Sequence, residues 1–129
     1  MIKIFELTGG DDPRGFNFTM PASAFEFVGQ VADVHISSSM PGDVRGNHYH
    51  LQKRRAILVL PGTAWSLHWE EGECTAVESR SFDGNCAVLV FVPPLASHAV
   101  RNDGSATLWL MACSSAPYDA NEVVARKVV

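Results

Sequence analysis

Short apolar or alternating segments, each ended by a turn signal, recur along the whole chain and constrain its fold more than any other feature. Turn signals roughly every 8 to 12 residues are typical of an all-β sandwich or barrel. The segment 65–70 alternates apolar and polar residues with the period of a strand. We therefore predict about ten strands, at 2–7, 15–20, 31–37, 45–50, 56–60, 64–70, 74–79, 87–92, 98–101 and 107–112. Residues 121–127 fit either one or two helical turns or a last edge strand.

Length and composition limit the classes of protein to which the chain can belong. Its 129 residues, 47% of them hydrophobic, suit a single domain over 1–129. The net charge of −4 lacks the basic footprint that nucleic-acid binding requires. No apolar run approaches the roughly 20 residues that span a bilayer, and the N-terminus has no signal-peptide pattern. We expect a cytoplasmic protein with neither nucleic acid nor membrane as a partner.

Three of the five histidines are placed so that they could meet. His48 and His50 lie two positions apart in a predicted strand, so both side chains point to one face. His98 follows the most apolar segment of the chain and a proline turn. We expect these three imidazoles to share one cavity. For His35 and His68 we expect core packing or surface exposure.

The spacing around these histidines resembles the two motifs of the cupin superfamily. The positions that match are Gly42, His48, His50 and Gly62 in the first motif and Pro93, His98 and Asn102 in the second. Arg55 stands where the first motif usually has Glu, and Leu95 where the second has Gly. The resemblance implies a double-stranded β-helix, that is, a jelly roll or cupin barrel, formed by a single domain over 1–129.

A narrower resemblance points to nucleotide-sugar enzymes within that superfamily. The segment 45–50, RGNHYH, is similar to one shared by deoxysugar 3,5-epimerases, by ketoisomerases acting on dTDP-4-keto-6-deoxyglucose, and by the C-terminal cupin of capsular polysaccharide assembling proteins. The segment 12–16 resembles one near their N-termini, and 118–126 resembles the ketoisomerase tail. This implies an isomerase or epimerase that removes a proton α to the ketone of a 4-keto-6-deoxy nucleotide sugar, in surface polysaccharide or deoxysugar biosynthesis.

The resemblance also implies roles for individual residues. His48 takes the position of the catalytic base, and His50 beside it could relay or donate a proton. A neutral imidazole, with a reference pKa near about 6.5, suits such a task. The remaining residues are expected to bind substrate, and they are Arg14, Arg45, Arg55, His98 and Asn47.

The general acid stays open at this point. Only Tyr49 and Tyr118 are tyrosines, and strand alternation turns Tyr49 away from His48. Of the basic run 53–55, we expect Lys53 and Arg54 on a solvated turn and Arg55 inside the barrel.

The sequence leaves two alternative functions open, and it also predicts an oligomeric state. The first alternative is a non-catalytic cupin module that binds a sugar or another ligand. The second is a metal-dependent, dioxygenase-type cupin in which His48, His50 and His98 hold Zn²⁺, Ni²⁺ or Fe²⁺. An inward Arg55 would oppose a dication, and the sugar chemistry itself requires no cofactor. We expect a homodimer that covers exposed sheet edges. The resemblance implies that Arg14 reaches the partner's site in such a dimer.

Overall fold

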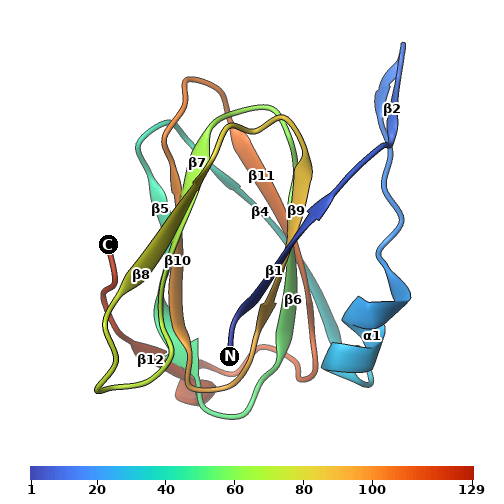
Figure 1. The fold of residues 1–129 in the computed structure, drawn as a ribbon. Helices are drawn as coiled ribbons and strands as arrows, with labels where there is room; N and C mark the ends of the chain where they lie inside the picture. The colour runs from blue at the N-terminus through green and yellow to red at the C-terminus, as the bar shows by residue number, and fades with distance from the viewer.

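The computed structural model describes residues 1–129 and consists mainly of two five-stranded antiparallel sheets packed face to face (Figure 1). The first sheet has the order β1 (Lys3–Leu7), β9 (Ala87–Val92), β6 (Arg55–Val59), β11 (Leu108–Ser114) and β4 (Asp33–Ser39). The second has the order β12 (Val123–Ala125), β5 (Val44–His50), β10 (Ser97–Asn102), β7 (Trp65–Glu70) and β8 (Glu78–Phe82). Strands distant in sequence are neighbours in both sheets. The jelly-roll prediction is thereby confirmed.

Smaller elements lie outside the two sheets. Strands β2 (Asp11–Asp12) and β3 (Gly15–Phe16) form a hairpin that projects from the body, at the upper right of Figure 1. Helix α1 (Ala22–Val28) lies beside the first sheet, and a 3₁₀ turn, η1 (Ala120–Glu122), precedes β12. No helix is long and apolar enough to cross a membrane.

Several predicted elements need correction. Helix α1 was not among the predicted elements, because seven residues are too few to establish a helical period, although Ala24 and Val28 form a buried i, i+4 pair. The strand expected at 15–20 covers only 15–16, and the one expected at 74–79 begins at Glu78. Residues 72–75 form a turn instead of the start of that strand, and in this turn the Thr75 amide donates to the carbonyl of Gly72 at 3.1 Å. Residues 121–127 contain both suggested forms, a 3₁₀ turn followed by an edge strand.

Two hydrophobic clusters form the core, one between the sheets and one beneath the helix. Between the sheets, Trp65 stacks on Phe82 with ring centroids 4.2 Å apart. On the outer side of the first sheet, α1 covers β6 and β9, where Phe27 stacks on Phe91 at 4.8 Å. Every residue of β9 is buried, because one face meets the second sheet and the other meets the helix side. This explains the uninterrupted apolar run at 87–92.

A β-bulge in β5 determines which of its side chains face the space between the sheets. His48 is opposite His98 and Gly46 is opposite Ala99, so Asn47, at φ 60°, is an extra residue in β5. The bulge shifts the alternation by one residue, and Arg45 therefore points to the same side as His48. Without it, strict alternation would place these two side chains on opposite faces.

The bulge depends on Gly46, and this gives a first prediction. Gly46 has φ 106°, and a Cβ there would lie 2.5 Å from the carbonyl oxygen of His98. We expect Gly46→Ala to lower the free energy of unfolding by roughly 2 kcal/mol or more, measured by chemical denaturation. Gly42→Ala is the control, because Gly42 also has a positive φ, 83°, but nothing lies within 4 Å of its Cβ position. Equal losses in the two variants would contradict the close approach of β5 and β10.

Candidate active site

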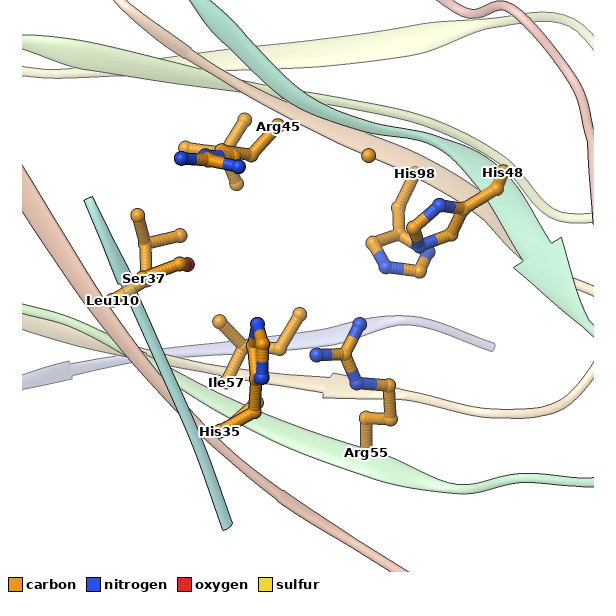
Figure 2. Close-up of a pocket in the computed structure, with 11 residues that line it drawn as sticks. His35, Ser37, Arg45, His48, Arg55, Ile57, His98 and Leu110 are labelled. Carbon is orange, nitrogen blue, oxygen red and sulfur yellow. The ribbon is translucent and has the colours of Figure 1, made fainter. Parts of the chain in front are cut away.

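A cavity between the two sheets contains most of the predicted site residues. Its inner chamber has a volume of about 200 Å³ and is shown in Figure 2. The chamber is lined from both sheets by His35, Ser37, Arg45, Gly46, His48, Arg55, Ile57, His98, Val100, Leu110 and Ala112. Its floor is apolar, and titratable side chains project over it from β4, β5, β6 and β10.

An outer chamber of about 630 Å³ adjoins the inner one. It adds Asp33, Asn47, His50, Lys53 and Tyr118 to the lining, together with small side chains of the C-terminal part of the chain. Four residues line both chambers, namely His35, Gly46, His48 and Arg55. The two chambers are therefore one continuous cleft, and we call these four residues its waist. The combined size is in the range of small-molecule binding sites.

The three histidines expected to converge do so. The ring centroid of His48 lies 5.1 Å from that of His50 and 5.2 Å from that of His98. His50 and His98 are 6.3 Å apart. Strand alternation brings the first two together, and the pairing of β5 with β10 adds the third.

Glu122 fixes the orientation of His50. Its Oε2 lies 2.9 Å from Nδ1 of His50, while its Oε1 accepts the backbone amides of Gln52 and Lys53 at 2.6 and 2.7 Å. Nδ1 of His50 therefore carries the proton that Glu122 accepts. The Nε2 atoms of His50 and of His48 are buried and have no hydrogen-bond partner, so both remain open to a ligand in the cleft.

The cleft keeps its imidazoles neutral. Burial, followed by the charges of His50, Arg55 and Lys53, lowers the pKa of His48 to about 4. Burial and Arg55 lower the pKa of His98 to about 3. Burial also lowers the pKa of His50, although the Glu122 hydrogen bond opposes it. The ordinary pKa assumed from the sequence therefore does not hold for the folded protein, in which all three rings are uncharged at neutral pH.

Arg55 faces the interior, as expected, and its position decides against the metal alternative. The guanidinium lines both chambers, and Figure 2 shows it directed toward the ring of His48. Burial lowers its pKa, but a guanidinium stays charged at neutral pH. No three His, Cys, Asp or Glu side chains are arranged to hold a metal ion. With this cation among the imidazoles, the residues of the cleft do not fit Zn²⁺, Ni²⁺ or Fe²⁺.

Two predicted substrate-binding residues have other partners in the structure. Arg14 lies on the projecting hairpin, outside both chambers, and its side chain is ion-paired to Asp12 at 3.2 Å. The Oδ1 atom of Asn47 accepts the amides of Val128 and Val129 at 2.8 and 3.2 Å. A substrate contact by this carboxamide would require the C-terminal segment to move. Arg45 lines the inner chamber, and its Nε donates to the carbonyl of Ser38 at 2.8 Å.

The basic run 53–55 differs in part from the expectation. Arg54 does not lie free on a turn, because its guanidinium donates to the carbonyls of Phe27 and Val28, both at 3.0 Å, at the end of α1. Lys53 is not solvated either, since its exposed fraction is 5% and it lines the outer chamber. Both expectations of a solvated turn face were wrong.

Sequence reasoning did not place His35 or Tyr118 in the cleft, nor Glu122 beside it. His35 belongs to the waist, and the alternation of Asp33, His35 and Ser37 was the signal that could have placed it there. Tyr118 lines the outer chamber, whereas Tyr49 faces the opposite side of the sheet, as alternation predicted. Nothing local in the sequence indicates that Glu122 contacts His50, because the two are 72 positions apart.

Comparison with known families agrees with this architecture. Residues 12–123 match the family described as the polysaccharide biosynthesis C-terminal domain. The chain belongs to this family. No curated protein sequence matches the chain.

Solved structures of several sugar-processing proteins have the same fold as this family member. CapF from Staphylococcus aureus superposes with a TM-score of 0.67 at 21% identity, over 74% of this chain but only 26% of CapF. A dTDP sugar isomerase from Desulfovibrio desulfuricans G20 gives 0.82 at 14% identity, over 98% of this chain and 84% of the isomerase. A 3,4-ketoisomerase from Helicobacter canadensis gives 0.71 at 18%, over 95% and 89%. The chain spans about a quarter of the length of CapF.

The buried neutral His98 predicts how stability depends on pH. The pKa of His98 is lowered from its ordinary value of 6.5 to about 3 in the folded protein, so between these pH values the unfolded chain binds a proton that the folded chain does not. Its contribution thus falls by up to about 1.4 kcal/mol per pH unit as pH drops below 6.5. We expect His98→Gln to show a smaller loss of unfolding free energy between pH 7 and pH 5 than the parent protein. Equal losses, by denaturant titration, would show that His98 is not buried in the neutral form.

Proposed function

We propose that the protein is an isomerase or epimerase that acts on a 4-keto-6-deoxy nucleotide sugar in polysaccharide biosynthesis. The observation that carries this proposal is the cleft itself, in which His48 presents a buried, unpartnered Nε2 beside the cation of Arg55. Membership of a polysaccharide biosynthesis family supports the pathway, and the fold shared with a dTDP sugar isomerase supports the substrate class.

The proposed reaction begins when Nε2 of His48 removes a proton from the carbon next to the ketone. The electrons of that C–H bond form an enediolate, whose oxygen gains negative charge. Arg55 stabilises this oxygen, because a fixed cation in a water-poor site lowers the energy of a developing anion. The ketoisomer forms when the hydroxyl on the deprotonated carbon gives its proton to the enediolate oxygen and the carbon that carried the ketone receives the proton from the base. The epimer forms when a proton returns to the opposite face of the carbon that lost it.

The environment of His48 is suited to an anionic substrate. In the free protein its pKa of about 4 makes it a weak base, because burial and the nearby cations oppose protonation. A bound anion and the enediolate offset these positive charges, so the imidazolium becomes more stable as the proton moves. Tyr118 is the hydroxyl donor of the outer chamber that could return the proton, and His50, whose own ring proton lies on Nδ1 toward Glu122, could relay a proton by first accepting it at Nε2.

The proposal predicts loss of proton exchange when His48 is replaced. With TDP-4-keto-6-deoxyglucose in deuterated water, we expect His48→Asn to slow α-deuterium incorporation by at least about 100-fold, as NMR would show. The control is His68→Asn, since His68 contacts Ser66 and lines neither chamber. Undiminished exchange in His48→Asn would remove His48 as the base. Sugar binding without exchange in the parent protein would favour the non-catalytic module.

We also propose that the protein is a homodimer. Val34 and Ile36 are 57% and 67% exposed on the edge strand β4, and Trp109 on the adjacent β11 is 51% exposed. This apolar surface continues to a free strand edge, which a second copy would cover. In such a dimer the projecting hairpin would carry Arg14 toward the partner's cleft.

Light scattering tests the dimer directly. We expect the parent protein to have twice the mass of one chain and Ile36→Glu to shift it toward the monomer, because a carboxylate would be buried in the interface. Val77→Glu is the control for surface charge, because Val77 is 51% exposed just before β8 in the second sheet, away from β4 and the hairpin. A monomeric parent protein at micromolar concentration would contradict the dimer and the role of Arg14 together.

A further inference from the structure

Lys53 is a buried cation without a partner. Only 5% of its surface is exposed, yet its ammonium group forms no hydrogen bond and no ion pair. Lys53 lies in the loop between β5 and β6, where its backbone amide donates to Glu122. Its side chain lines the outer chamber. Lysines this buried are rare in proteins unless an anionic group compensates the charge.

Arg55, at the waist of the cleft, also lacks a partner for its charged group. Its guanidinium has no hydrogen-bond or ion-pair partner, although it too is directed into the cleft (Figure 2). The charges of Asp33 and Glu122 raise the pKa of Arg55 and so offset part of its buried charge, but neither carboxylate forms an ion pair with Arg55 or Lys53. Both oxygens of Glu122 are engaged by His50 and two backbone amides, and Asp33 forms no ion pair. Two positive charges therefore line one chamber, and neither is held in an ion pair.

We propose that Lys53 and Arg55 form a diphosphate subsite in the outer chamber. An arginine fork and a lysine ammonium together match the several oxygens of a diphosphate. The identification of the ligand as a nucleoside diphosphate sugar rests on the proposed function. The subsite then gives the substrate a direction, with its phosphates in the outer chamber and its hexose across the waist, over His48 and His98.

The surrounding electrostatics agree with this assignment. Lys53 and Arg55 both lower the pKa values of His48 and His50, so an anion placed between the cations would raise them. Arg45 lies on the opposite side of the inner chamber from Arg55 in Figure 2, and its Nε is already bound to Ser38. Substrate binding and activation of the base would thus be coupled through the same two side chains.

Calorimetric titration with inorganic pyrophosphate tests the subsite without any sugar. We expect Lys53→Met to raise the Kd for pyrophosphate and for TDP by roughly tenfold or more, because one charged contact is lost. Methionine keeps the apolar stem, so the fold should be retained, which a thermal melt verifies. Lys3→Met is the matched control, because Lys3 lies exposed on β1, outside the cleft. Inorganic phosphate is expected to bind more weakly than pyrophosphate.

Each outcome bears on the subsite separately from the reaction. An unchanged Kd in a folded Lys53→Met protein, or no pyrophosphate binding by the parent protein, would overturn it. Equal affinity for phosphate and pyrophosphate would also count against a diphosphate site. If Lys53→Met loses pyrophosphate while the parent protein exchanges no sugar protons, the subsite stands and the proposed reaction fails. If exchange occurs and the Kd is unchanged, the reaction stands and the subsite fails.

Discussion

The buried positive charge of Arg55, placed among three imidazoles, is the constraint on which the rest of the site depends. Burial and this charge keep His48 and His98 neutral, and they make the cleft unsuitable for a divalent cation. Lys53 adds a second cation that no carboxylate neutralises. The cleft is therefore arranged to receive an anion, and the same electrostatics would strengthen His48 as a base once that anion is bound.

Two features of the backbone bring these groups together. The bulge at Asn47 turns Arg45 and His48 to the same side of β5, and Gly46 permits the close approach to β10 that the bulge requires. The C-terminal segment then completes the cleft, because Glu122 orients His50 while the carboxamide of Asn47 holds Val128 and Val129. Residues more than 70 positions apart in the sequence thus depend on each other.

Local pattern was sufficient for much of the fold and for part of the site. The alternation of Trp65 to Glu70 and the apolar run of β9 predicted strands correctly, and the spacing of His48, His50 and His98 predicted their convergence. The burial of Lys53 and the contact of Glu122 with His50 depend on how distant segments pack, so no local pattern carries them. The bulge was also hidden, because one extra residue changes every side chain beyond it without changing the composition of the strand.

Long-range ¹H–¹⁵N NMR of the histidine side chains tests the central claim most directly, because ring nitrogen shifts report both protonation and tautomer. Between pH 7 and pH 5 we expect the rings of His48 and His98 to stay neutral and His50 to keep its proton on Nδ1, toward Glu122. Titration of His48 and His98 with midpoints near about 6.5, as for free histidine, would show that the cleft is neither dry nor positively charged.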